Sequence, residues 1–325
     1  MKGKEILLAI LMGIVLPSFL FSVVEKLLPY KEMNAVEQTI ATEPKQEQTE
    51  PHAFADTIIP VIQPDGKTIN MKLEEYLVGV ILGEMPLNFD MEALKAQAVV
   101  ARTYTLRRVL LSQKHDGGAV CMNSACCQSY SALEQYVGSK ALLNKAISAV
   151  ASTTGQVVTY HGTLIEATYF SCSGGRTEDA QAVWGADIPY LQSVDSPGEE
   201  NAIHYTESVQ FTKEQFANLI GIPLSGDPAK WFGEVTYTTG GGVDTIYIGG
   251  IPLKGTLIRQ KLGIRSTAFT ITPLGDSVHV VTKGFGHRVG MSQYGAEAMA
   301  VTGSDYRQIL SHYYPGTELT NRNQN

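Results

Sequence analysis

Two stretches of the chain carry apolar residues at the spacing of a helix. In LEEYLVGVILGEMP, apolar side chains from Leu73 to Val80 recur every three or four positions, which predicts a helix that ends before Pro86. The stretch MEALKAQAVVARTYTLRRVLLSQ follows Asp90, and an aspartate at this position can cap a helix. Its middle, residues 96–101, is apolar on nearly every side. We therefore expect a central, buried helix.

The apolar period changes to two farther along the chain. QVVTYHGTLIEATYF has β-branched residues on both sides of His161 and Gly162, which predicts a hairpin that turns there. TKEQFANLIG predicts a short helix, because Thr212 and Gln215 are spaced as a capping box and Gly221 can end it. Short strands are also expected in GGGVDTIYIGG and in FTITPLGDSVHVV.

These elements occur in blocks rather than in alternation. Further helices are expected over about 138–152, in TLIRQKLG and over about 295–313. Blocks of helices and of mostly antiparallel strands are typical of the α+β class. We expect a helical N-terminal part with the buried central helix, packed on mostly antiparallel strands and hairpins, with a groove between two lobes.

The N-terminus has the pattern of a membrane anchor. Lys2 and Lys4 precede an uncharged run from Ile6 to Val24. Such a run covers roughly 28 Å at about 1.5 Å per residue, close to the ~30 Å of a bilayer core. Because lysines favour the cytoplasmic side, we expect residues 1–30 to be a cytoplasmic stub and transmembrane anchor. The protein would then be a single-pass protein of the cell membrane with its remainder outside the cytoplasm.

Composition divides the rest of the chain in two. Residues 31–55 are rich in glutamate and glutamine and read as a disordered tether, which leaves 56–320 for the folded, catalytic domain. The net charge of −7 argues against nucleic acid as a partner, because nucleic-acid interfaces need a basic surface.

Glu84 is the first candidate for chemistry. It stands in the segment GEMP, at the end of the first predicted helix, among apolar neighbours that include Leu82 and Met85. An apolar environment raises the pKa of a carboxyl group, which suits a general acid near neutral pH. The alternative is a solvated glutamate at a helix end.

Arg102 lies in the predicted buried helix, with Lys95 on a similar face. A buried guanidinium needs a partner, because an unpaired charge in the interior is costly. One interpretation is an internal salt bridge. The other is a clamp for a substrate carboxylate, which a guanidinium binds through two parallel hydrogen bonds.

Two glycine-containing loops are candidates for ligand contact. In YFSCSGGRTE the small residues would let backbone N–H groups approach a ligand; they are Ser171, Ser173, Gly174 and Gly175. In GFGHRVGMSQYGA, glycines bracket His287, Arg288, Ser292 and Gln293 before a helix. Tight turns without a ligand are the alternative for both loops.

Three of the four cysteines follow His115 in the segment HDGGAVCMNSACCQ. His115, Cys121 and Cys127 are evenly spaced, so one loop could hold a tetrahedral zinc ion with them, and Cys126 could replace Cys127 or add a fourth ligand. A disulfide from Cys121 to either later cysteine, or free thiols, are the alternatives.

Together, four motifs resemble the stage II sporulation protein D family. They are LEEYLVGVILGEMP, ALKAQAVVARTYTL, YFSCSGGRTEDAQAVWGADIPYLQSV and GFGHRVGMSQYGAEAMA, in this order between Leu73 and Pro315. The resemblance implies a lytic transglycosylase of sporulation and engulfment, which cleaves peptidoglycan glycan strands already stripped of their peptides. It further implies cooperation with the stage II sporulation protein P amidase and with membrane partners of the engulfment machinery at the sporulation septum.

The resemblance also assigns roles to residues. Glu84 matches the family's catalytic acid and base, Arg102 matches a position that the family requires, and Lys95 occupies another matching position; the resemblance implies that both contact substrate. The two glycine-containing loops match the substrate groove. Members with this histidine and cysteine pattern bind zinc near the active site. The sequence departs where the family often has serine or threonine at Cys172 and lysine at Gln192, which removes one cationic contact near Tyr190.

Three rival functions belong to other classes. A zinc amidase or peptidase would use the His115 cluster to activate water. A cysteine peptidase would pair Cys172 with His287. A glycan-binding protein would hold stripped strands without cleaving them.

Overall fold

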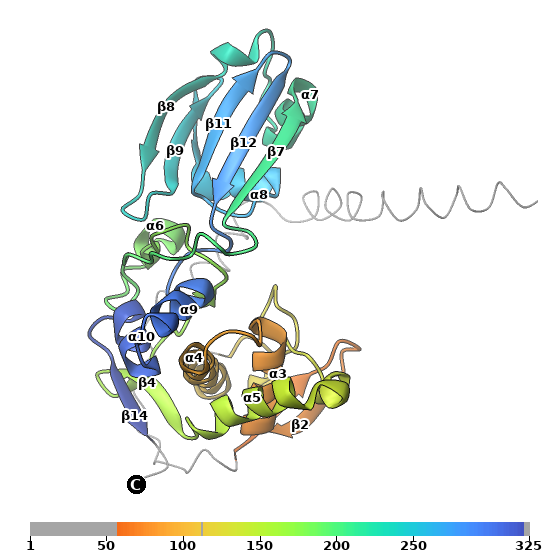
Figure 1. Ribbon diagram of the computed structural model, residues 1–325. Coiled ribbons are helices and arrows are strands. Elements are labelled where there is room, and N and C mark those ends of the chain that lie inside the picture. The colour runs from red at the N-terminus through yellow and green to blue at the C-terminus, as the bar shows by residue number, and fades with distance from the viewer. Residues whose placement is uncertain (1–56, 112, 322–325) are drawn as a thin grey trace, which may run out of the picture. The chain divides into compact units, whose positions relative to one another are not determined.

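The computed structural model describes residues 57–111 and 113–321, and two hydrophobic cores form within them (Figure 1). The second core is built from residues 206–283. The first core is built from the elements before and after that segment in the sequence. The expected α+β class is confirmed, because helices and mostly antiparallel sheets occur in separate blocks.

Five helices build most of the first core. Helix α4 contacts the other four and strand β4, so the expected central, buried helix is confirmed (Figure 1). Asp90 caps it by accepting the Glu92 N–H at 2.8 Å. The helices are α3 (Leu73–Glu84), α4 (Met91–Leu110), α5 (Lys140–Ala151), α9 (Gln293–Val301) and α10 (Tyr306–Tyr313).

Three small sheets complete the first core. Strand β1 lies between β2, to which it is antiparallel, and β3, to which it is parallel; β4 lies between β14 and β5; and β6 pairs with β13 in parallel. Their bounds are β1 (Ile58–Ile62), β2 (Thr68–Lys72), β3 (Val120–Cys121), β4 (Gln156–Tyr160), β5 (Thr163–Leu164), β6 (Tyr169–Phe170), β13 (Met291–Ser292) and β14 (Glu318–Asn321). Short helical segments are Asp116–Gly118, Leu133–Ser139 and α6 (Ala180–Trp184).

The predicted hairpin at His161 and Gly162 is confirmed, but its second arm is shorter than expected. Both turn residues have positive φ, 48° and 77°, as a tight hairpin turn requires. The second arm pairs with β4 only through Thr163–Leu164. Residues Tyr169–Phe170 leave that sheet and pair with β13 instead.

The second core lies among two three-stranded antiparallel sheets and two helices. Figure 1 shows α7 and α8 beside strands β7, β11 and β12, and the capping box of Thr212 and Gln215 on α7 is confirmed. The elements are β7 (Thr206–Thr212), α7 (Lys213–Ile220), Pro228–Lys230, β8 (Phe232–Tyr237), β9 (Val243–Ile248), β10 (Ile251–Lys254), α8 (Gly255–Leu262), β11 (Phe269–Leu274) and β12 (Ser277–Lys283).

A buried ion pair joins segments from the two cores. Arg288 has a left-handed backbone, with φ of 67°, and its side chain is almost completely buried. Its Nη1 donates to Glu178 at 3.1 Å, and its Nη2 donates to the Gly240 carbonyl at 2.7 Å. Glu178 in turn accepts the Gly242 N–H at 3.0 Å. Arg288 is therefore a structural residue and not a loop residue open to ligand.

The expected membrane location is corrected by the structure. Across residues 57–111 and 113–321, every helix is too short or too polar to cross a bilayer, which overturns the expectation of a single-pass membrane protein. The run on which that expectation depended, residues 6–24, and the expected tether, 31–55, lie outside the described residues.

Candidate active site and metal centre

Glu84 is the last residue of α3, and its carboxyl group lies in a largely apolar setting. Its sequence neighbours Leu82 and Met85 are buried, with exposed fractions of 4% and 5%. The Met85 N–H donates to the Ile81 carbonyl at 3.1 Å, so the helical hydrogen-bond pattern extends one residue beyond Glu84. Burial raises the pKa of Glu84 above that of an ordinary glutamate.

Three neutral groups hold the Glu84 carboxyl. The Ser129 N–H donates to Oε1 at 2.5 Å, and the Gln293 side-chain amide donates to Oε2 at 3.4 Å. The hydroxyl of Tyr169 also lies within hydrogen-bonding reach. These donors favour the charged form and lower the pKa, but burial is the larger effect. The carboxyl is thus oriented by neutral donors, and no cation of residues 57–111 or 113–321 is among the groups that shift its pKa.

Two glycines in α3 explain how Ser129 reaches Glu84. Gly79 and Gly83 are four residues apart on one helix face, and the segment of Ser129 and Tyr130 packs directly against that face. The Ser131 N–H donates to the Gly79 carbonyl at 2.9 Å. Our sequence reasoning missed Ser129, although the GVILG spacing within the helix was a usable signal for a close approach.

Substitution of Gly83 by alanine is expected to destabilise the protein. A Cβ at this position would lie 2.8 Å from the Tyr130 N atom and 2.9 Å from the Ser129 C atom, both of them backbone atoms that cannot rotate away. Overpacking costs about 1–3 kcal/mol, whereas alanine gains only about 1 kcal/mol of helix propensity. We expect a lower free energy of unfolding in a denaturant titration. Gly138→Ala is the control, because open space surrounds Gly138; equal stability of the two variants would contradict the prediction.

Pairing of strands β6 and β13 brings Tyr169 and Gln293 to the Glu84 carboxyl. Tyr169 lies on β6, which pairs in parallel with β13, and Gln293 directly follows β13 at the start of α9. Ser292 caps α9 by accepting the Gly295 N–H at 3.1 Å, and its hydroxyl donates to the Ser171 carbonyl at 3.4 Å. Of the residues predicted to contact substrate, the structure places Gln293 against Glu84.

The Ser173–Gly175 loop binds a protein carboxylate. Glu199 Oε2 accepts the backbone N–H groups of Ser173 at 2.6 Å and Gly174 at 3.1 Å, and also the Ser173 hydroxyl at 2.9 Å. The Gly175 N–H donates to the Ser173 hydroxyl. These contacts argue against the expectation that the amides face a ligand, because Glu199 accepts two of them and the Ser173 hydroxyl accepts the third.

Arg102 forms an internal ion pair. Its side chain is fully buried, and Nε and Nη2 bind the two carboxylate oxygens of Glu74 at 2.8 and 2.7 Å. The remaining N–H groups donate to Thr153 Oγ1 and to the carbonyls of Gln156 and Val150. All five donors have protein acceptors, so the structure favours the salt bridge over the substrate clamp.

Lys95 and Tyr190 are also engaged within the fold. The Lys95 ammonium pairs with Glu92 at 2.6 Å and lies 5.8 Å from the centre of the Tyr306 ring. Tyr190 is buried, and its hydroxyl accepts the Glu166 N–H at 3.0 Å. Neither residue is brought to Glu84 by these contacts.

Cys172 and His287 do not have the properties of a nucleophile and its base. Cys172 is fully buried, and burial raises the pKa of its thiol to about 12. Burial also lowers the pKa of His287 to about 4, and its Nδ1 accepts the Val289 N–H at 3.1 Å. A nucleophilic cysteine needs a lowered pKa, so the structure disfavours the cysteine peptidase.

The loop after α4 gathers four metal-binding side chains. The ligand atoms of His115, Cys121, Cys126 and Cys127 all lie within 4.8 Å of one another. Strand β3 fixes Cys121 through its pairing with β1, while the N–H groups of Cys126 and Cys127 both donate to the Asn123 carbonyl. All four cysteines of the chain are free thiols, so the disulfide alternative is absent from the structure.

Two of the distances between these atoms match the edge of a tetrahedral site. His115 Nε2 lies 3.4 Å from Cys126 Sγ and 3.5 Å from Cys127 Sγ. Zinc bonds of about 2.0–2.1 Å to nitrogen and about 2.3 Å to sulfur imply an edge of about 3.6 Å in a tetrahedron. One imidazole and three thiols are a ligand set typical of closed, structural zinc sites. Cys126 thus joins the set as a fourth candidate rather than as a substitute for Cys127.

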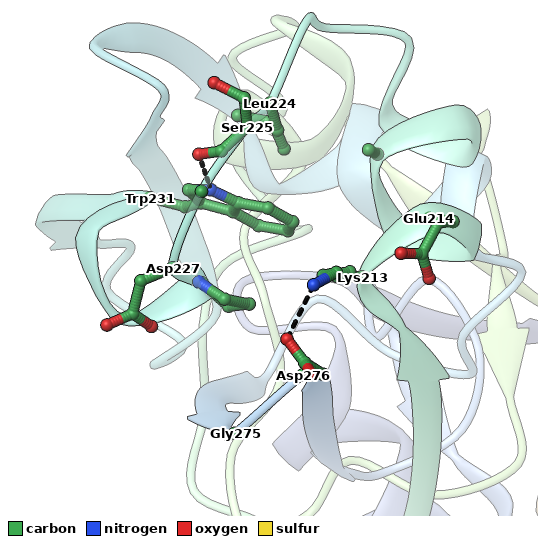
Figure 2. A pocket seen from close by; sticks show the side chains of 11 residues that line it. Lys213, Glu214, Leu224, Ser225, Asp227, Trp231, Gly275 and Asp276 are labelled. Carbon is green, nitrogen blue, oxygen red and sulfur yellow. Dashed lines mark hydrogen bonds and ion pairs between the residues drawn. The ribbon is translucent and has the colours of Figure 1, made fainter.

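A hollow of about 500 Å³ lies elsewhere, on the second core (Figure 2). Trp231 and three acidic side chains line it, and Figure 2 shows the Lys213–Asp276 ion pair at its edge, with an N–O distance of 2.6 Å. None of the predicted site residues lines this hollow. It is therefore separate from the site around Glu84.

Comparison with known proteins finds a family model and relatives whose descriptions agree with one another. A family model described as Stage II sporulation protein matches residues 65–160. Stage II sporulation protein D of Bacillus subtilis (strain 168) is 39% identical over 290 residues, which cover 86% of this chain and 84% of that protein. The protein of the same name from Bacillus amyloliquefaciens is 37% identical, with 90% and 85% covered.

A third relative is more distant. The Amidase enhancer of Bacillus subtilis (strain 168) is 29% identical over 300 residues, which cover 75% of this chain but only 40% of that protein. The two stage II relatives match almost the whole of both chains, in agreement with the four sequence motifs. The chain belongs to the stage II sporulation protein D family.

Proposed function

We propose that this protein is a lytic transglycosylase that cleaves the MurNAc–GlcNAc bonds of peptide-free peptidoglycan strands and leaves 1,6-anhydro-MurNAc ends. Membership of the family supports a role in sporulation. The finer role proposed is remodelling of septal wall during engulfment, after an amidase has removed the stem peptides. The observation that carries the proposal is the half-buried Glu84 carboxyl, which neutral donors orient at a helix end.

The environment of Glu84 suits both halves of the reaction. Burial raises its pKa, so the protonated form persists at higher pH than for a solvated glutamate and can donate to the leaving glycosidic oxygen. Once the carboxyl is ionised, the Ser129 N–H and the Gln293 amide stabilise the carboxylate. The carboxylate can then accept the proton of the muramic C6 hydroxyl as that oxygen bonds to the anomeric carbon.

A single carboxyl group is sufficient for this chemistry. Hydrolytic glycosidases usually need a second carboxylate to activate water or to form a covalent intermediate. Here the nucleophile belongs to the sugar itself, so proximity replaces a positioned water. In the described part of the chain, the groups that shift the pKa of Glu84 include no second carboxylate, which supports the transglycosylase over a two-carboxylate hydrolase.

We also propose that zinc is bound by His115, Cys121, Cys126 and Cys127. Bound zinc would cross-link the loop after α4 and would not itself act on the substrate, because four protein ligands leave no position for a reactive water. This ligand set disfavours the zinc amidase or peptidase, which requires an open coordination position.

Metal analysis of the purified full chain is expected to give about one equivalent of zinc. His115→Ala should lose most of it, because imidazole supplies one of the four ligands. His279→Ala on β12 is the matched control and should retain the full equivalent. A zinc content near zero in the unsubstituted protein would reject the metal centre.

Digestion of purified, peptide-free glycan strands tests the proposed activity. Reducing ends and anhydro ends are counted separately by mass spectrometry after incubation with the full chain. We expect anhydro ends to accumulate without a matching gain of reducing ends. Reducing ends alone would mean hydrolysis, and binding of strands without new ends would favour the glycan-binding protein.

A further inference from the structure

Three consecutive residues, Cys127, Gln128 and Ser129, connect the His115 and cysteine cluster to Glu84. Cys127 faces His115, with Sγ 3.5 Å from Nε2. Gln128 is fully buried. Ser129 donates its N–H to the Glu84 carboxyl at 2.5 Å. Because Gln128 directly joins Cys127 to Ser129, its position determines where both the Cys127 Sγ and the Ser129 N–H lie.

Both polar atoms of the Gln128 side-chain amide form hydrogen bonds. Its Nε2 donates to Thr105 Oγ1 at 2.9 Å and to the Tyr76 hydroxyl at 3.4 Å. Its Oε1 accepts from the Tyr169 hydroxyl at 3.2 Å. Gln128 thereby ties the loop to α4, α3 and β6 at once. A buried amide with these partners fixes the backbone on either side of it.

Tyr169 extends the connection to the catalytic carboxyl. Its one hydroxyl proton has two acceptors, Gln128 Oε1 and the Glu84 carboxylate. When Glu84 is protonated, Tyr169 can donate to Gln128 and offer a lone pair to the carboxyl proton. When Glu84 is ionised, the hydroxyl can turn to donate to it. Gln128 thus sets the resting orientation of a group that contacts Glu84 directly.

We propose that Gln128 is a positioning residue that couples the His115, Cys121, Cys126 and Cys127 cluster to the Glu84 carboxyl. It acts through the Ser129 N–H on one side and the Tyr169 hydroxyl on the other. This inference rests on the proposed role of Glu84 and deepens it. Coupling between two sites acts in both directions, so removal of the Glu84 carboxyl is expected to change the affinity for metal.

The test measures Zn²⁺ affinity of the full chain by competition with a chelator at one fixed pH, without glycan. Gln128→Met keeps the size of the side chain but removes all three hydrogen bonds, and we expect Zn²⁺ to bind about 10-fold more weakly, as for loss of groups that orient metal ligands. Glu84→Ala should also weaken Zn²⁺ binding, since it frees the Ser129 N–H. In Gln128→Met, the added Glu84→Ala change should have little further effect.

Gln97→Met on α4 is the matched control. Gln97 is equally buried, but both polar atoms of its amide are without a hydrogen-bond partner among the described residues. Its replacement should leave Zn²⁺ affinity unchanged. Unchanged affinity in both Gln128→Met and Glu84→Ala, or independent additive effects of the two, would overturn the coupling, as would failure of the chain to bind Zn²⁺.

Glycan digestion then separates the two proposals. We expect Gln128→Met to lower kcat for anhydro-end formation more than it changes KM, because the substitution disturbs the acid and not the strand-binding surface. If the substitutions alter Zn²⁺ affinity but the unsubstituted chain makes no anhydro ends, the coupling stands and the transglycosylase fails. If anhydro ends form normally and Zn²⁺ affinity does not respond, the coupling alone fails.

Discussion

Glu84→Gln is expected to lower the rate of anhydro-end formation by about 10²–10⁴-fold, the usual contribution of a general acid and base. Glutamine preserves an acceptor for the Ser129 N–H and nearly the same volume, so the surrounding contacts should survive. It cannot transfer a proton to the glycosidic oxygen. The variant should therefore still bind stripped strands while releasing almost no anhydro ends.

The pH dependence of the proposed reaction follows from the same residue. In that reaction cleavage begins with protonated Glu84, so the rate should fall as the pH rises through the pKa of that carboxyl. Burial raises this pKa, so the fall should occur at higher pH than for a solvated glutamate. A rate profile measured with glycan strands at several pH values checks the direction.

Glu75→Gln is the control for Glu84→Gln. Glu75 lies on the same helix but is exposed. Its replacement by glutamine also removes one carboxylate, but at a solvated position. It should retain normal activity, and both variants should unfold at similar denaturant concentrations. Continued production of anhydro ends by Glu84→Gln at the normal rate would refute the assignment.

Arg288→Met is expected to lower the free energy of unfolding by about 3–5 kcal/mol, more than Gly83→Ala or Arg307→Met. The exposed fractions of the two side chains in the Arg288–Glu178 pair are only 2% and 1%. Removing the guanidinium leaves the Glu178 charge in the interior without its partner, which is the costly way to break a buried pair. It also frees the Gly240 and Ser173 carbonyls, which Arg288 holds at 2.7 Å each.

Denaturant titration measures this effect, with Arg307→Met as the control. Arg307 is an exposed arginine, 3.9 Å from Asp305, and such pairs contribute about 0–1 kcal/mol. Adding Glu178→Gln to Arg288→Met should recover part of the lost stability, because the second change removes the unpaired charge. Equal stability of the Arg288 and Arg307 variants would show that the buried pair contributes nothing.

Predictions of helix ends, caps and turns were confirmed, because these features depend on residues that are close together in the chain. The end of α3 before Pro86, the Asp90 cap of α4 and the capping box at Thr212 were all predicted and are present. Each depends on residues within about one helical turn. The same holds for the hairpin turn at His161 and Gly162, whose positive φ values are set by the turn itself.

Strands whose partners are distant in sequence were missed. The predicted folded domain includes residues 56–72, but no strand was predicted there, whereas β1 and β2 lie in this segment and β1 also pairs with β3, which contains Cys121. Strand β14 near the C-terminus pairs with β4, more than 150 residues away in the chain. No local period reveals such a pairing, because a short edge strand has too few residues to show one.

The amino-acid sequence alone determined the fold class, the family resemblance, the position of Glu84 among apolar neighbours and the loop that carries the histidine and cysteines. Only the tertiary structure decided which polar groups meet. It paired Arg102 with Glu74 and the Ser173 and Gly174 amides with Glu199, and it brought Ser129, Tyr169 and Gln293 to Glu84. The physical reason is that burial strongly favours pairing of polar groups, and the partner can come from any part of the chain.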